Sequence, residues 1–242
     1  MKYFINSILQ KLGYRISRVP INEGLNVFEI QKVLLEDSGN ALTIFDVGAY
    51  KGDVTMNYKS LFPDSNIYSF EPYPDSFNIL KKRTAMYQNI HPVNKALGSD
   101  KGRSVFYSNK SAPTNSILPP DGESRKFWYD TCPIKMDAIE VELDTIDNFV
   151  SKNYIDKIDI LKIDTQGSEF LVLKGAEESF RQGKIGLIYM EIITVPTYEG
   201  QKHLDEYLFQ LRSYGFHMYN FYNFSFTHNG MIRQLDCIFT RS

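Results

Sequence analysis

The chain has 242 residues, of which 43% are hydrophobic and 14% aromatic, enough for a sizeable core in one α/β domain. Its 27 Lys and Arg side chains against 29 Asp and Glu give a net charge of −2, so it lacks the strongly basic surface that indicates a nucleic-acid partner. No apolar run approaches the ~20 residues of a transmembrane helix. The two cysteines, Cys132 and Cys237, lie far apart without a CxxC pair, which indicates reduced thiols in a cytoplasmic protein.

Residues 1–40 are predicted to form an N-terminal helical segment ahead of a domain over 41–242. Apolar side chains recur at helical spacing, with Lys and Arg nearby, in MKYFINSILQKLGYRISR. Polar residues interrupt this apolar pattern and no small-residue cleavage site follows, so it is not a signal peptide. We expect a helix that packs on the domain or on a second subunit, which would form a homodimer. A membrane-surface helix is the alternative.

Apolar, strand-like runs alternate with helix-patterned segments in the rest of the chain. We predict strands at 43–48, 66–71, 91–97, 159–165 and 185–193, and helices at 53–61, 74–88, 168–182 and 201–214. Such alternation is typical of βαβ units and a parallel sheet. Residues 216–226 and 234–240, separated by His228-Asn229-Gly230, predict a closing antiparallel hairpin.

The segment 109–137 has four prolines and no clear periodicity. A loop of that length inside a compact domain is usually functional or mobile. We predict a lid or acceptor loop over the carboxyl edge of the sheet, with a disordered surface insertion as the alternative.

The stretch TIFDVGAYKG, residues 43–52, joins an apolar strand through a glycine turn to a helix. A dinucleotide turn reads GxGxxG, and its second glycine admits the pyrophosphate. Counted from Gly48, the second and third positions are Tyr50 and Asp53, whose side chains would obstruct that group. An NAD-dependent oxidoreductase is therefore disfavoured, and the GxxxxGK[ST] phosphate loop is absent as well.

An amino-acid-bearing cofactor suits this turn better. The carboxylate of Asp46 can lie near an ammonium group, and the backbone amides from Ala49 to Gly52 can face a carboxylate at the helix start. S-adenosylmethionine carries both groups and no phosphate. Glu71 closes the next strand, where an acid typically binds ribose hydroxyls; alternatively it only ends a strand before Pro72.

Several stretches resemble the FkbM family of S-adenosylmethionine-dependent methyltransferases. They are FDVGAYKGDVT, YSFEPYPDSFNILKK, VNKALGSDKG, ELDTIDNF, DILKIDTQGSEFLVLKGA and QLDCIF. The resemblance runs from about Thr43 to the C-terminus, and its most specific pieces are LKIDTQGSE with LKGA and the FDVGA turn. It implies a Rossmann-like class I methyltransferase fold, with a mostly parallel seven-stranded sheet and helices on both faces, that O-methylates hydroxyls of sugars, glycans and polyketides.

The resemblance also implies which residues bind the cofactor. The methionine part would lie along the turn, at Asp46, Gly48, Ala49, Tyr50 and Gly52. The ribose would lie at Glu71, with Pro72 and Tyr73 beside it, and the adenine between Asn94 and Ala96. The family often has Glu where this chain has Gln166, which leaves Asp164 as the fixed acid there.

Methyl transfer needs a hydroxyl oxygen in line with the methyl group and a group that removes the proton. Asp164 and Glu191 close two strands that we expect to be neighbours, so their carboxylates could converge on one hydroxyl or one cation. We predict Asp164 as general base or Mg²⁺ ligand and Glu191 as its partner. A helix cap and a structural ion pair are the respective alternatives. His203 is a second candidate base, and Glu169 is expected to complement a helix dipole.

The predicted function is methyl transfer to a hydroxyl of a sugar, a glycan or a glycosylated natural product. RNA or another small molecule is the alternative acceptor, disfavoured for RNA by the near-neutral charge and the missing Asn/Asp-Pro-Pro-aromatic motif. A non-catalytic cofactor-binding module is the third hypothesis, against which the acids at both strand ends argue.

Overall fold

A computed structural model describes residues 25–39, 41–108, 114–128 and 137–241. The chain divides into two compact units, Met1–Ser38 and Gly39–Ser242. In the first unit, α2 (Val27–Leu34) begins at Asn26, whose side chain accepts the backbone N–H groups of Phe28 and Glu29, and η1 (Glu36–Ser38) follows. Residues 1–24 of the predicted N-terminal helical segment lie outside the described residues. Among the described residues, no helix is long and apolar enough to cross a membrane.

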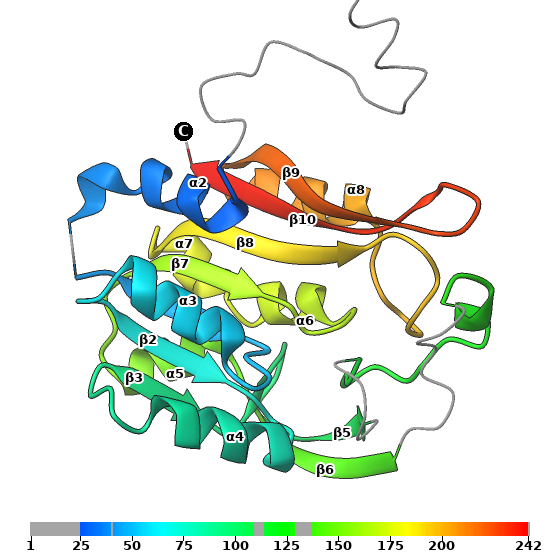
Figure 1. Cartoon of the computed structure of the whole chain (residues 1–242), viewed down its shortest axis with the longest axis horizontal. Helices are drawn as coiled ribbons and strands as arrows, with labels where there is room; N and C mark the ends of the chain where they lie inside the picture. Colours follow the sequence, from blue (N-terminus) through cyan, green and yellow to red (C-terminus); the bar gives the residue numbers. More distant parts are fainter. Residues whose placement is uncertain (1–24, 40, 109–113, 129–136, 242) are drawn as a thin grey trace, which may run out of the picture. The chain divides into compact units, whose positions relative to one another are not determined.

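The second unit is built on a seven-stranded sheet in the order β3-β2-β1-β7-β8-β10-β9 (Figure 1). Its parallel strands are β1 (Thr43–Val47), β2 (Asn66–Phe70), β3 (Ile90–Val93), β7 (Ile158–Ile163) and β8 (Ile185–Ile193). Strands β9 (Phe216–Phe226) and β10 (Ile232–Arg241) form the antiparallel hairpin at one edge. The α/β fold with a mostly parallel seven-stranded sheet is confirmed.

Helices cover both faces of this sheet (Figure 1). On one face lie α3 (Asp53–Leu61) and α4 (Pro74–Thr84). On the other face lie α5 (Ile146–Lys152), α6 (Glu169–Lys174), α7 (Glu177–Arg181) and α8 (Leu204–Ser213). The core of the second face joins Phe149, Leu173, Phe180 and Leu211 of these helices to buried strand residues such as Phe45. Side chains alternate along a strand, so Asp46 points to the face of α3, where Thr55 donates to it.

The predicted strand over 91–97 was wrong as one element. The chain leaves the main sheet after Val93, where the N–H of Lys95 donates to the Val93 carbonyl. The rest becomes β4 (Ala96–Leu97), which pairs with β6 (Asp137–Asp144) in a second sheet of order β4-β6-β5, with β5 (Gly102–Ser108) on the other side. Neither β5, β6 nor α5 was predicted.

The predicted helix over 168–182 was also wrong as one element, since it breaks between α6 and α7. At the break, a Cβ on Gly175 would overlap the carbonyl oxygen of Gly98, so the chain passes too close there for a side chain. Helix α7 then starts as a separate helix, because the Asp147 carboxylate accepts the N–H groups of Glu178 and Ser179 in its first turn. The predicted helices at 74–88 and 201–214 are shorter in the structure, at Pro74–Thr84 and Leu204–Ser213.

Candidate active site

A cavity of about 230 Å³ opens at the carboxyl ends of β1, β2 and β7. It is lined by Val47, Gly48, Ala49, Tyr50, Asp53, Val54, Phe70, Glu71, Pro72, Lys95, Ala96, Leu97, Phe106, Asn115, Ile117, Lys162, Asp164, Thr165, Gln166 and Ser168. Seven predicted site residues are in this set, namely Gly48, Ala49, Tyr50, Glu71, Pro72, Ala96 and Asp164. Six are not, namely Asp46, Gly52, Tyr73, Asn94, Glu191 and His203.

Two glycines shape the turn between β1 and α3. Gly48 has φ +78°, and a Cβ there would overlap the backbone carbonyl of Asp164. Gly52 has φ +88°, and its Cβ would lie 2.7 Å from Cδ1 of Leu80 on α4. Tyr50 between them also has a positive φ of 48°, which is strained for a bulky residue. The glycines therefore let the turn pack tightly against β7 and α4.

The backbone amides of this turn are mostly used within the protein, which corrects the expectation that Ala49 to Gly52 all face a ligand carboxylate. Ala49 donates to the Phe70 carbonyl at 2.9 Å, Tyr50 to Glu71 Oε2 at 2.8 Å, and Gly52 to the Ala49 carbonyl at 2.8 Å. Within the described part of the chain, only the amide of Lys51 among these four has no such partner.

Asp46 lies beneath the turn and not on the cavity. It is fully buried, its Oδ2 accepts the Thr55 hydroxyl at 2.6 Å, and its Oδ1 lies 2.9 Å from Nζ of Lys162. Burial alone would lower the pKa of the Lys162 ammonium, but the carboxylates of Asp46 and Asp164 outweigh it and raise that pKa. The expected partner of Asp46 was a cofactor ammonium; the structure supplies an internal one. Sequence reasoning missed Lys162, although a lysine inside the apolar run DILKID was a signal for it.

Glu71 lines the cavity at the end of β2. Its Oε2 accepts the N–H of Tyr50 and its Oε1 that of Tyr73, each at 2.8 Å. Burial raises the pKa of this carboxyl to about 7, against the lowering effect of the two amides. Each oxygen accepts one amide and keeps capacity for a further donor from the cavity.

Asn94 and Ala96 lie on either side of the turn out of β3. The Asn94 side chain donates to the carbonyls of Glu71 and Pro72, at 2.8 and 3.1 Å, so it supports the backbone around Glu71. Ala96 lines the cavity together with Leu97 and with Phe106 of β5. Phe106, Lys95 and the loop residues Asn115 and Ile117 were not predicted as site residues, because the second sheet that brings them there was missed.

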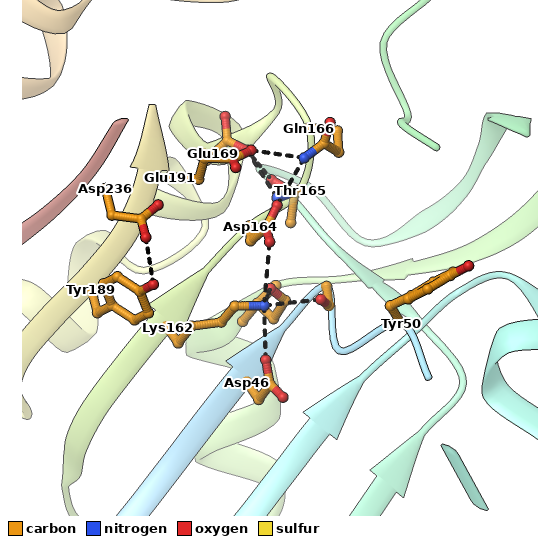
Figure 2. Close-up of polar contacts among 12 residues, drawn as sticks. Asp46, Tyr50, Lys162, Asp164, Thr165, Gln166, Glu169, Tyr189, Glu191 and Asp236 are labelled. Carbon is orange, nitrogen blue, oxygen red and sulfur yellow. Dashed lines mark hydrogen bonds and ion pairs between the residues drawn. The ribbon is translucent and has the colours of Figure 1, made fainter. Parts of the chain in front are cut away.

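Asp164 and Glu191 are joined by one amide (Figure 2). Nε2 of Gln166 lies 2.9 Å from Oδ1 of Asp164 and 2.8 Å from Oε2 of Glu191. The Asp164 side chain is 36% exposed, whereas burial and the neighbouring Asp164 carboxylate raise the pKa of Glu191 well above its ordinary value. The two carboxylates are thus close together, with Asp164 on the cavity and Glu191 behind it; their convergence on one hydroxyl or one cation stays a prediction.

Other acids nearby have structural partners. Glu169 is buried, and its Oε1 accepts the amides of Thr165 and Gly167 at 2.9 and 3.1 Å; burial raises its pKa to about 7. Asp236 accepts the Tyr189 hydroxyl at 2.6 Å (Figure 2). His203 is exposed directly before α8, and its N–H donates to Glu206. His203 does not line the cavity, so this geometry gives no support to its predicted role as a base.

The described part of segment 109–137 is anchored to the loop after β8. Trp128 donates through Nε1 to Thr197 at 2.7 Å and packs against Val195 and Tyr198. Backbone hydrogen bonds join Pro119 to Glu199 and Asp121 to Thr197. Whether the whole segment acts as a lid stays a prediction, since 109–113 and 129–136 lie outside the described residues.

No group of three or more His, Cys, Asp or Glu side chains within the described ranges is arranged to hold a metal ion. The Lys162 ammonium lies 3.9 Å from Oδ2 of Asp164. The groups around the cavity fit S-adenosylmethionine better than a metal ion. Glu71 is a carboxylate with spare acceptor capacity, and Asp164 is a second carboxylate beside the glycine turn. An apolar wall for a base is formed by Ala96, Leu97 and Phe106.

The parallel sheet with an antiparallel terminal hairpin, and the cavity at its carboxyl edge, define the class I S-adenosylmethionine-dependent methyltransferase fold. A sequence model described as the methyltransferase FkbM domain matches residues 46–218. The chain belongs to this FkbM family.

Known proteins similar to the chain are methyltransferases. Methyltransferase sdnD of Sordaria araneosa is 27% identical over 156 residues, which cover 56% of this chain and 60% of that protein. The 2-O-methyltransferase NoeI of Sinorhizobium fredii (strain NBRC 101917 / NGR234) is 26% identical over 179 residues, 71% of each. A solved rRNA methylase from Streptococcus thermophilus has the same fold, with a TM-score of 0.50 at 12% identity, over 90% of this chain and 98% of that one.

Proposed function

We propose that this methyltransferase acts on a hydroxyl oxygen of a sugar, a glycan or a glycosylated natural product. The observation that carries the proposal is Asp164, a partly exposed carboxylate on the cavity beside the glycine turn and Glu71. The name of NoeI, a 2-O-methyltransferase, supports an oxygen acceptor at 26% identity. The buried free thiol of Cys237 is compatible with the cytoplasmic location that we include in the proposal.

The proposed cofactor site uses residues from four segments. Glu71 would accept the ribose hydroxyls, with Pro72 beside it. Ala96, Leu97 and Phe106 would flank the adenine, and Asn94 would support the backbone of Glu71 and Pro72. The methionine part would lie along Gly48, Ala49 and Tyr50, near the amide of Lys51, while Asp46 and Gly52 shape the turn from behind.

S-adenosylmethionine, when bound, supplies the methyl group as an electrophile and leaves as a neutral thioether. In our proposal, Asp164 accepts the proton of the acceptor hydroxyl as the new oxygen–carbon bond forms. Burial and the Asp164 carboxylate raise the pKa of Glu191, and Glu191 lies behind Asp164, so our proposal makes Asp164 the base and Glu191 its partner. Gln166 holds the two groups at fixed positions. The remaining rate would come from placing the hydroxyl in line with the methyl group.

The test is transfer of a labelled methyl group to a panel of free sugars, oligosaccharides and sugar nucleotides. With an acceptor found, Asp164→Asn is expected to lower kcat about 10²–10⁴-fold, the usual contribution of a general base. Asp100→Asn is the matched control, since Asp100 lies outside the cavity and its carboxylate accepts, among the described residues, only the hydroxyl of its neighbour Ser99. An unchanged rate in Asp164→Asn would remove Asp164 from the mechanism.

Chelator separates the two roles of Asp164. If Asp164 binds Mg²⁺, activity is lost with EDTA and returns with added Mg²⁺. If it is a metal-free base, EDTA has no effect while Asp164→Asn remains inactive. Transfer to RNA but to no carbohydrate would contradict the proposed acceptor class.

A further inference from the structure

Lys162 occupies an unusual position for a lysine. All six residues of β7 are buried, and Lys162 in the central part of the sheet is only 3% exposed. Removing an ammonium group from water costs several kcal/mol unless partners replace the water. The sheet register places Lys162 directly beside Asp46 of β1, so an ion pair is one reason for its presence.

The ion pair does not account for all contacts of the ammonium. Nζ of Lys162 lies 2.9 Å from Oδ1 of Asp46, and equally 2.9 Å from the carbonyl oxygen of Gly48. It also lies 3.9 Å from Oδ2 of Asp164 (Figure 2). The last two groups belong to walls of the cofactor cavity, the glycine turn and the end of β7.

The peptide unit between Gly48 and Ala49 is consequently held from both sides. Its carbonyl accepts from Lys162, and its N–H donates to the Phe70 carbonyl of β2 at 2.9 Å. A glycine with φ +78° has several other conformations open to it at little cost. The lysine therefore restricts the flexible point of the turn that leads into Tyr50 and Lys51.

We propose that Lys162 is a positioning residue of the cofactor site, which holds the Gly48 carbonyl and the end of β7 in the orientation that binds S-adenosylmethionine. Its role thus exceeds that of a counter-ion for Asp46. The inference rests on the cofactor site proposed above, and it is independent of the acceptor.

The test compares affinity for S-adenosylhomocysteine with stability. In Lys162→Met with Asp46→Asn, both charges of the pair are removed, so no uncompensated buried charge remains. We expect calorimetric titration to give a Kd at least tenfold weaker than wild type, with a melting temperature near that of wild type. Thr55→Val is the matched control: it removes the hydroxyl bonds to Asp46 and Ser69, should lower the melting temperature, and should leave the Kd within about twofold.

A double variant that binds S-adenosylhomocysteine as tightly as wild type would overturn the proposal, because Lys162 would then only neutralise Asp46. If that variant does not fold, Lys162→Gln with Asp46→Asn repeats the comparison. Its amide ends one atom short of Nζ and cannot span to Gly48, so the same loss is expected and wild-type affinity would again overturn the proposal. A wild-type chain that binds the ligand but methylates no carbohydrate would contradict only the acceptor class. A wild-type chain that does not bind S-adenosylhomocysteine would contradict both the proposed function and the role of Lys162.

Discussion

At the scale of single residues, acids with raised pKa values gather at the carboxyl edge of the sheet. Glu71, Glu169, Glu191 and Asp236 all have a pKa raised by burial, while Lys162 is the buried ammonium beside them. Glu71 and Glu169, with a pKa of about 7, are of the kind found in sites that bind charged or proton-donating ligands. Two of these groups give measurable consequences.

Binding of S-adenosylhomocysteine is expected to release protons near pH 7. Burial raises the pKa of Glu71 to about 7, and hydroxyl donors from a ribose favour its ionised form, which lowers that pKa in the complex. Affinity should therefore rise about tenfold between pH 6 and pH 8. Titration calorimetry in buffers of different ionisation enthalpy measures the protons released. Glu71→Gln should bind more weakly and lose this dependence; an equal proton release in that variant would exclude Glu71 as the source.

Gln166 is expected to affect turnover more than cofactor binding. Its amide is the shared donor to Asp164 and Glu191. Its φ of 54° is a strained backbone conformation, which places the side chain between the two acids. Gln166→Leu should lower kcat about tenfold and leave the Kd for S-adenosylhomocysteine within about twofold. Tyr198→Phe is the comparison variant, since it removes the 3.3 Å contact to the other end of the amide together with the 2.8 Å hydrogen bond to the Thr114 carbonyl, and leaves the Gln166 amide donor in place. Equal losses in kcat and affinity would indicate a structural role.

At the scale of elements, the break between α6 and α7 shows how helices are set by contacts distant in the chain. Gly175 lets the helix pass the Gly98 backbone, and Asp147 of α5 then serves as the cap of α7. Neither partner is adjacent to the break in sequence.

Asp147→Ala is expected to destabilise the chain by about 1–2 kcal/mol, the usual cost of losing a helix cap. The Asp147 carboxylate accepts the backbone amides of Glu178 and Ser179 and the Ser179 hydroxyl. Urea unfolding measures the loss. Asp156→Ala, at an exposed position between α5 and β7, serves as control, and equal midpoints for the two variants would show that Asp147 does not cap the helix.

At the scale of the whole molecule, the buried acids make stability depend on pH in an unusual direction. Burial raises the pKa of Glu169 from 4.5 to about 7, so the folded state binds its proton more tightly than the unfolded chain does. Stability from this group is therefore lost as pH rises through about 4.5 to 7, and gained as pH falls through that window. Ordinary acid denaturation takes over only at lower pH.

The melting temperature of wild type is accordingly expected to rise as pH falls from about 8 to about 6. Glu169→Gln imitates the protonated group and should flatten this slope, reducing the change in unfolding free energy between pH 8 and pH 6 by about 1 kcal/mol. Differential scanning calorimetry at matched ionic strength measures it. A variant with the wild-type slope would assign the pH dependence to other carboxyls, Glu191 first.

Local features of the sequence determined much of this protein. The run TIFDV is followed by a glycine turn, NIYSF by Glu71, and DILKI by Asp164. Strand propensity, turn chemistry and the βαβ alternation were enough to place the cavity at the carboxyl edge of a parallel sheet. These predictions succeeded because each depends on residues that are neighbours in the chain, and because parallel strands bring their carboxyl ends together whatever their partners.

Only the tertiary structure decided which partner each polar group takes. Asp46 pairs with Lys162 instead of facing the cavity, Asn94 supports Glu71, and the helix after Asp164 breaks where Gly175 meets Gly98. The second sheet, which brings Phe106 to the cavity, was likewise invisible to sequence periodicity. In each case the deciding contact joins residues distant in sequence, and the energy of burying a charge or a backbone group depends on what the fold places beside it.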